Sequence, residues 1–200
     1  MRVSRIQAEE NRQKVIDVAS RLFRAHGFDG IGLKELMKGA GLTQGAFYKQ
    51  FASKDDLAAK ASERALESAT RKWSAAAEAN PKDPLGAVIA FYLCPEQRAE
   101  RMEGCPVVAL GSDAARQGVD VKASFEAGIR KYLEMLGGWI GEPDGGDSSG
   151  KAMAILSTMV GALVLSRAVN NKRLSKRFLQ AAAKSLTGLS AGAAQNGQLR

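Results

Sequence analysis

The residues with the clearest chemical role lie in one short run of the chain, from Ala40 to Phe51. Gln44 opens a short predicted helix there, and glutamine is one of the few side chains that can make two hydrogen bonds to an adenine base. Gly45 and Ala46 follow it, and such small side chains let a helix backbone approach another molecule closely. In a helix-turn-helix, the first turn of the second helix meets base edges in the major groove. The run therefore predicts a surface that binds double-stranded DNA.

The residues around this turn would shape it and contact phosphates. Gly41 has the backbone freedom that a sharp turn between helices needs, and the Thr43 hydroxyl is placed to cap the amides that follow. Phe47 and Phe51 are four residues apart, so they share the helix face that would hold this segment on its neighbours. The side chains that then point outwards, toward phosphates, are Tyr48 and Lys49.

Composition and charge are those of a folded globular chain that attracts polyanions. The 200 residues are 45% hydrophobic and 25% charged, which excludes disorder for most of the chain. The formal net charge is +8, to which residues 1–60 contribute +4 and residues 141–200 contribute +5. A basic surface attracts nucleic acid without specifying it, and the C-terminal excess fits a solvated face equally well.

The sequence carries no pattern for export or membrane insertion. Residues 1–13 are polar and charged and lack the apolar core of a secretory signal. The most apolar stretch, Ala152 to Ala168, is shorter than the roughly 20 residues that a membrane span requires, so we expect a buried helix there. Cys94 and Cys105 are too few for a disulfide scaffold. These features predict a cytoplasmic protein with free thiols and no membrane partner.

Hydrophobic spacing predicts helices throughout, and hence an all-α fold. Glu96 to Gly104 and Gly141 to Gly150 are expected to be irregular. Besides the very short helix that starts at Gln44, we expect helices over about residues 7–25, 33–39, 53–80, 85–93, 106–116, 125–140, 151–171 and 174–187.

These helices divide into two expected domains and a tail. Residues 1–52 would form a three-helix helix-turn-helix domain, residues 53–188 a ligand-binding and dimerisation domain, and residues 189–200 a disordered tail. Ser53 caps the helix that joins the two domains. The helix over 151–171 is apolar nearly all round, and a partner subunit is the simplest cover for it.

The N-terminal part resembles the DNA-binding domain of the TetR/AcrR (tetracycline-repressor) family of bacterial transcription regulators. Two positions depart from the family pattern: Gly32 stands where Thr or Ser usually caps the second helix, and Gln50 stands where an aromatic residue or His is common. Weaker similarity covers Gly104-Cys105-Pro106 and residues 160–165. The resemblance rests on Ala19, Leu22-Phe23, Gly27-Phe28, Glu35-Leu36, Ala40-Gly41-Leu42-Thr43, Gly45, Phe47-Tyr48, Phe51, Lys54 and Leu57.

The resemblance implies a homodimer of about nine helices per chain, whose last two helices pair with those of the partner across a two-fold axis. It also implies a pocket for a small-molecule effector, whose binding moves the two DNA-binding heads and releases a palindromic operator, as in a repressor. Carried over position by position, the DNA contacts are Lys34, Thr43, Gln44, Gly45, Ala46, Tyr48, Lys49 and Lys54. The candidate dimer contacts are Met159, Leu163, Phe178 and Ala182.

Residue type suggests the walls of the pocket, because apolar and aromatic side chains line most small-molecule sites. An ordinary hydrophobic core explains the same side chains. The candidates are Phe91, Tyr92, Met102, Tyr132, Met135 and Trp139.

No arrangement typical of catalysis accompanies these features. One histidine and two cysteines cannot complete a four-ligand zinc site, and we expect neither a cofactor, nor a metal, nor enzymatic activity. Two alternatives remain open. Cys94 and Cys105 could form a redox switch in place of a small-molecule inducer, or in addition to one. The protein could also be a small-molecule carrier without affinity for DNA.

Overall fold

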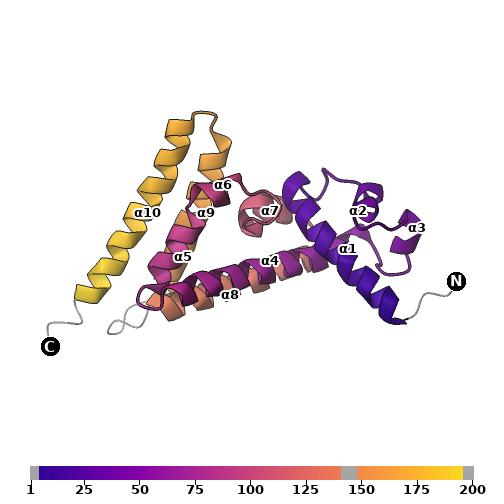
Figure 1. Ribbon diagram of the computed structural model, residues 1–200, viewed down its shortest axis with the longest axis horizontal. Coiled ribbons are helices and arrows are strands. Elements are labelled where there is room, and N and C mark those ends of the chain that lie inside the picture. Colours follow the sequence, from indigo (N-terminus) through magenta and orange to yellow (C-terminus); the bar gives the residue numbers. More distant parts are fainter. Residues whose placement is uncertain (1–4, 141–147, 196–200) are drawn as a thin grey trace. The chain divides into compact units, whose positions relative to one another are not determined.

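A computed structural model describes residues 5–140 and 148–195, which form ten helices and no strand (Figure 1). The all-α prediction is confirmed, with one helix more than expected. The helices are α1 (Arg5–His26), α2 (Leu33–Gly39), α3 (Gln44–Phe47), α4 (Lys54–Ala79), α5 (Pro84–Tyr92), α6 (Pro95–Ala99), α7 (Pro106–Ala114), α8 (Val119–Ile140), α9 (Ser148–Ala168) and α10 (Lys172–Gln195).

Packing groups the chain into two compact units. The first unit comprises residues 1–69 and 101–128, and the second comprises residues 70–100 and 129–200. Both α4 and α8 contribute residues to each unit. The boundary expected after residue 52 divides the chain by function rather than by packing, and it stays a prediction.

The core of the first unit includes the faces of α1, α2 and α3 that meet one another. Val15, Ala19 and Phe23 recur at helical spacing on one face of α1, and all three are buried. Leu36 of α2 and Phe47 of α3 are buried with them. Burying each large apolar side chain stabilises a fold by roughly 1.5–3 kcal/mol, so this shared core holds three short sequence segments together.

The turn between α2 and α3 is closed by two backbone hydrogen bonds. The Gly41 amide donates to the Lys38 carbonyl at 2.9 Å, and the Leu42 amide donates to the Met37 carbonyl at 2.9 Å. This pair of bonds is the Schellman arrangement, which favours a residue in the left-handed region. Gly41 has a φ of +72°, so the role expected for this glycine is confirmed.

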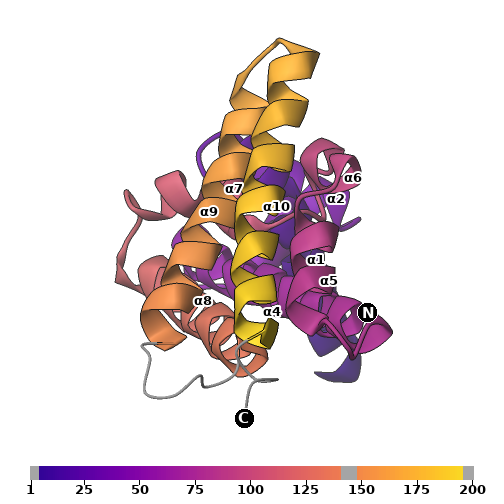
Figure 2. The same ribbon diagram turned by 90° about the vertical axis from the view of Figure 1, so that its left-hand side faces the viewer.

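An aromatic cluster and a helical hairpin build the second unit. Trp73 of α4 stacks on Tyr132 of α8 with ring centroids 4.5 Å apart, and it meets Tyr92 of α5 edge-on at 5.7 Å. All three side chains are buried. The helices α9 and α10 lie side by side as an antiparallel pair (Figures 1 and 2). The hairpin therefore buries one face of α9 within its own chain.

A short helix lies in the segment that we expected to be irregular, residues 96–104. Helix α6 begins with Pro95, which suits the first position of a helix. The carbonyl oxygens at its C-terminal end accept hydrogen bonds from the Arg167 side chain on α9. The prediction was wrong because the partner that stabilises this segment is far away in the sequence.

Several helix ends also differ from their expected positions. Helix α8 begins at Val119 rather than near residue 125, and α9 begins at Ser148. Helix α10 continues to Gln195, so residues 189–195 of the expected disordered tail are helical. The rest of the expected loop and tail, residues 141–147 and 196–200, lies outside the described residues.

Among the described helices, α9 is long and apolar enough to cross a membrane by length and composition alone. Core helices of soluble proteins pass the same test, and 33% of the apolar window of α9 is buried within this chain. Another face of α9 is exposed.

Replacing Gly41 with alanine should destabilise the fold, because a side chain in the left-handed region costs about 1–2 kcal/mol. Urea denaturation followed by circular dichroism measures this change in the free energy of unfolding. Gly45→Ala is the matched control, since a Cβ atom added to Gly45 would meet nothing within 4 Å. Equal stability of the Gly41→Ala variant and the wild type would contradict the role given to this turn.

Candidate nucleic-acid interface

The candidate interface centres on α3, a helix of only 4 residues. Thr43 precedes it with extended backbone, φ −83° and ψ 153°, and the Ala46 amide donates to the Thr43 carbonyl at 3.0 Å. The Thr43 side chain makes no capping hydrogen bond, so the expected cap through its hydroxyl is wrong. The side chain is exposed instead, where its hydroxyl can meet a partner.

Two phenylalanines fix α3 to the rest of the first unit. Phe47 and Phe51 are 1% and 3% exposed, and their rings stack with centroids 5.4 Å apart. The Arg12 guanidinium of α1 lies over the Phe51 ring, 5.5 Å from its centroid. Because an isolated helix of this length is unstable in water, these contacts decide which way its outer face points.

The residues expected to meet DNA lie on that outer surface. Gln44, Gly45 and Lys49 are exposed, Tyr48 is 69% exposed, and Ala46 is half-buried. A Cβ atom at Gly45 would find open space, so packing within the chain does not require glycine at this position. Its small size leaves room for something outside the chain.

Lysines surround α3 without acidic partners. Within the described residues 5–60, only Lys60 among the lysines forms an ion pair, with Asp56. Two of the others were expected to contact DNA from neighbouring helices: Lys34 is exposed in the first turn of α2, and Lys54 is half-buried at the start of α4. The lysines with no ion pair are Lys14, Lys34, Lys38, Lys49 and Lys54.

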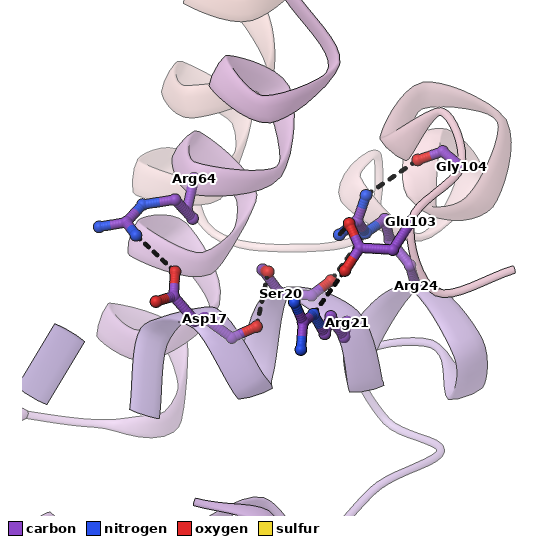
Figure 3. A network of polar contacts seen from close by, with 7 residues as sticks. All are labelled: Asp17, Ser20, Arg21, Arg24, Arg64, Glu103 and Gly104. Carbon is purple, nitrogen blue, oxygen red and sulfur yellow. Dashed lines mark hydrogen bonds and ion pairs between the residues drawn. The ribbon is translucent and has the colours of Figure 1, made fainter. Parts of the chain in front are cut away.

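Several arginines of the first unit are bound to carboxylates instead. Arg21 and Arg24 on α1 both pair with Glu103, and Arg64 on α4 pairs with Asp17 (Figure 3). A guanidinium held in this way orients helices and is not available to a ligand. These three arginines therefore hold the fold together, in contrast to the five lysines without ion pairs.

Sequence reasoning missed Lys14 and Lys38. The Lys14 ammonium lies beside the turn between α2 and α3, 3.6 Å from where a Cβ atom of Gly41 would stand. Helical spacing could have found it. Val18 packs closely on Gly39 of α2, and Lys14 lies one turn before Val18 on the same face of α1.

The start of α4 positions Lys54. The Ser53 hydroxyl accepts a hydrogen bond from the Asp56 amide at 3.0 Å, and the Asp56 carboxylate accepts one from the Ala52 amide at 3.1 Å, so the predicted cap is confirmed. Burial alone would raise the pKa of Asp56, but hydrogen bonds from Lys60 and Ala52 and the charge of Lys60 lower this pKa overall. The ionised carboxylate therefore holds Lys60 and leaves Lys54 available.

The candidate pocket residues are not all brought together. Tyr92 and Tyr132 are buried in the aromatic cluster with Trp73. Met102 is 44% exposed and belongs to the first unit, so it is not grouped with the others. The remaining candidates are half-buried in the second unit: Phe91, Met135 and Trp139.

The candidate dimer contacts need a correction. Met159 and Leu163 are completely buried within their own chain, Ala182 is also buried, and Phe178 is half-buried. The first three therefore pack inside the chain and not on its free surface. The spacing of hydrophobic residues in α9 and α10 could not by itself show which face of each helix packs against the other.

The two cysteines lie in different units. Cys94, half-buried before α6, belongs to the second unit, and Cys105, buried before α7, belongs to the first. Burial raises the pKa of the Cys94 thiol, which leaves less of the reactive thiolate at neutral pH. Within the described residues, no three His, Cys, Asp or Glu side chains form a group that could hold a metal ion.

Comparisons with known proteins bear on this surface. A model of the family described as bacterial regulatory proteins, tetR family, matches residues 15–61, which run from α1 into α4. The HTH-type transcriptional regulator LmrA of Bacillus subtilis is 24% identical over 167 residues, which cover 81% of this chain and 89% of LmrA. The regulator AcrR of Shigella flexneri is 45% identical over 56 residues, which cover 28% of this chain and 26% of AcrR.

Solved structures share the fold over nearly their whole length. A TetR-family regulator from Cytophaga hutchinsonii aligns with a TM-score of 0.81 at 21% identity, over 96% of this chain and 98% of its own. The reduced form of NemR from E. coli aligns with a TM-score of 0.76 at 20% identity, over 90% of this chain and 96% of NemR. FadR from Bacillus subtilis, solved in complex with stearoyl-CoA, aligns with a TM-score of 0.67 at 16% identity, over 89% of this chain and 96% of FadR. With the family match over α1 to α4, these similarities identify the chain as a helix-turn-helix transcriptional regulator of the TetR family.

Proposed function

We propose that this regulator is a ligand-responsive repressor, which binds a palindromic operator as a homodimer and is released by a small molecule. The observation that carries the proposal is the first turn of α3, where Gln44 and Gly45 are exposed, with lysines that form no ion pair around it. Lysines without an ion pair gain no stability for the fold from their charge, whereas beside DNA they release counterions and so favour binding.

The exposed groups divide into base-reading and phosphate-binding roles. The Gln44 amide, at the start of α3, suits two hydrogen bonds to an adenine edge in the major groove. Gly45 and Ala46 let the helix approach the bases closely. The remaining groups would fix the position of the helix on the backbone without reading sequence. The residues assigned to phosphates are Lys34, Thr43, Tyr48, Lys49 and Lys54.

The outward face of α9 supports association of two copies. An apolar helix face of this length is unfavourable in water, and small residues on it allow another helix to come close. In a two-fold dimer, two α3 helices could enter successive major grooves about one DNA turn, roughly 34 Å, apart. The face is uncharged, and all of its residues are exposed except Gly161, which is half-buried: Met153, Ala154, Ser157, Gly161, Val164, Leu165 and Ala168.

The aromatic cluster of the second unit is the best-supported place for the effector. Trp73, Tyr92 and Tyr132 offer flat apolar surfaces together with phenol hydroxyls, which is the composition of many small-molecule sites. The rings touch one another, so a ligand that binds among them must part them. The solved complex of FadR with stearoyl-CoA supports a ligand-binding role for this fold.

Footprinting of the full-length protein on the DNA upstream of its own gene tests the proposal. We expect a symmetric protected site with two half-sites about one helical turn apart, and loss of protection when the effector is added. Tight binding of a metabolite without any protected DNA would instead make the protein a small-molecule carrier.

Replacing Gln44 with alanine should remove discrimination at one base position in each half-site, by about 1–3 kcal/mol. Operator variants titrated by fluorescence anisotropy measure this difference. Lys49→Ala is the control, because loss of a phosphate contact should weaken all operator variants equally. The same uniform loss in both variants would overturn the division of roles.

Replacing Val164 with glutamate should dissociate the dimer and leave the monomer folded, because Val164 is 42% exposed on the uncharged face of α9. Analytical ultracentrifugation measures the association. Gln180→Glu adds the same charge on the cationic side of α10, between Lys176 and Lys184, and should leave the dimer intact. Equal association of both variants would rule out this face.

A redox-responsive regulator is the second candidate. The likeness to NemR, which was solved in a reduced form, favours this candidate. Cys105 also directly follows Gly104, whose carbonyl accepts a hydrogen bond from Arg24 of α1. On this hypothesis, peroxide changes the operator affinity of the wild type and has no effect on a Cys94→Ser, Cys105→Ser double variant. An unchanged wild type would remove the candidate.

A further inference from the structure

Helices α9 and α10 carry cations but no acidic side chain. Residues 148–195, which form these two helices and the turn between them, contain seven lysines and arginines and no aspartate or glutamate. Arg167 is used within the second unit, where it donates to carbonyl oxygens of α6, and Lys151 is exposed near the start of α9. The other five are exposed on α10, and we call them the cationic stripe: Lys172, Arg173, Lys176, Arg177 and Lys184.

The cationic stripe points away from the buried side of its own helix. Arg173, Arg177 and Lys184 are separated by four and seven residues, so they lie on one line along α10 (Figure 2). This line is about 16 Å long, by the rise of an α-helix. Lys172 and Lys176 are four residues apart and lie beside the line. The opposite face of α10 is the buried one, and its residues are Ser175, Leu179, Ala182 and Leu186.

Folding does not favour this arrangement of charge. Four of the five cations lie in the first two turns of α10, and its first turn has no acidic residue. The amides at a helix N-terminus carry partial positive charge, so cations near them are unfavourable. Like charges four residues apart on a helix also repel each other, and the stripe has two such pairs: Lys172 with Lys176, and Arg173 with Arg177. The stripe therefore lowers the stability of its own helix.

Exposed cations on other helices of this chain are arranged differently. Arg12 lies 3.7 Å from Glu9 on α1, and Lys131 lies 3.0 Å from Glu134 on α8. By contrast, no member of the cationic stripe forms an ion pair with another described residue. A surface that serves only solubility mixes charges of both signs. The stripe therefore fits an anionic partner from outside the chain.

The chemistry of the stripe favours DNA over other anionic partners. A membrane surface would also require apolar side chains beside the cations, but among the large apolar side chains described for α10 only Leu174 is exposed, at 41%. A second copy of the chain would bring the same cations face to face across a two-fold axis. A DNA duplex presents a phosphate charge about every 1.7 Å along its axis, so a line of about 16 Å can neutralise several phosphates.

We propose that the cationic stripe is a second DNA-binding surface, which binds phosphates of a duplex without reading their sequence. Helix α10 belongs to the second unit and α3 to the first, so two separate parts of the fold contact DNA. The stripe raises the affinity for every duplex, whether or not the duplex contains an operator. The inference goes beyond the proposed function, because it requires neither an effector, nor a palindromic operator, nor a dimer.

The salt dependence of binding to a duplex of random sequence tests the stripe. The stripe variant combines Arg173→Gln, Arg177→Gln and Lys184→Gln. It is compared with its parent in a background that carries Lys49→Ala and Lys54→Ala, which weakens the contacts around α3. Each phosphate contact adds about 0.9 to the slope of log affinity against log salt concentration, so the stripe variant should lower this slope by about 2–3 per chain.

The matched control combines Lys82→Gln, Lys131→Gln and Lys151→Gln in the same background. It removes the same total charge from exposed positions of the second unit outside α10, and it should lower the slope by less than about 0.5 per chain. Equal slopes for the two triple variants would overturn the proposal. A slope that depends on the stripe, in a protein that protects no operator, would retain this proposal and overturn the proposed function instead.

Two further measurements test other roles for the stripe. The urea midpoint of the stripe variant should equal or exceed that of the wild type, because repulsion between cations is removed. A lower midpoint would show that the stripe stabilises the fold, and would overturn the proposal. Sedimentation with phosphatidylserine vesicles should be absent at protein concentrations that bind DNA. Binding to vesicles that depends on the stripe, with an unchanged slope for DNA, would make a membrane the partner and overturn the proposal.

Discussion

The stacking of Phe47 on Phe51 is the contact on which the DNA-binding surface depends. Helix α3 has 4 residues, too few to be stable alone, so its direction is set by these two buried rings and by the closed turn at Gly41. Every group assigned to DNA on α3 takes its place from this anchor. Loss of either ring would leave Gln44 on a segment without a defined direction.

Around that anchor, the positive charges are divided by residue type. Arginines such as Arg24 and Arg64 are bound to carboxylates and carbonyls and connect helices, which suits a planar group with several donors. Lysines such as Lys49 have no acidic partner in the described part of the chain. In the first unit, Arg21, Arg24 and Arg64 thus hold parts of the fold together, whereas the lysines around α3 remain without ion pairs, where polyanions are attracted.

Short-range signals in the sequence predicted the first unit well, because its turn and caps are local. Gly41 at the turn and Ser53 at the start of α4 have the expected roles. The errors concern features that depend on distant partners. Helix α6 is bound by Arg167 of α9, and Met159 is buried on a helix that packs against α10. Helical spacing shows that a face is apolar, but it cannot show whether the same chain or a second one covers it.

The salt dependence of operator affinity tests the central claim most directly. Affinity is measured at several salt concentrations for the wild type, Lys54→Ala and Lys60→Ala, two changes on the same helix. Since each phosphate contact adds about 0.9 to the slope of log affinity against log salt concentration, Lys54→Ala should lower the slope by about that amount. Lys60→Ala should leave the slope unchanged, because Asp56 already holds that lysine. Equal slopes for Lys54→Ala and the wild type, or a lower slope for Lys60→Ala, would contradict the account.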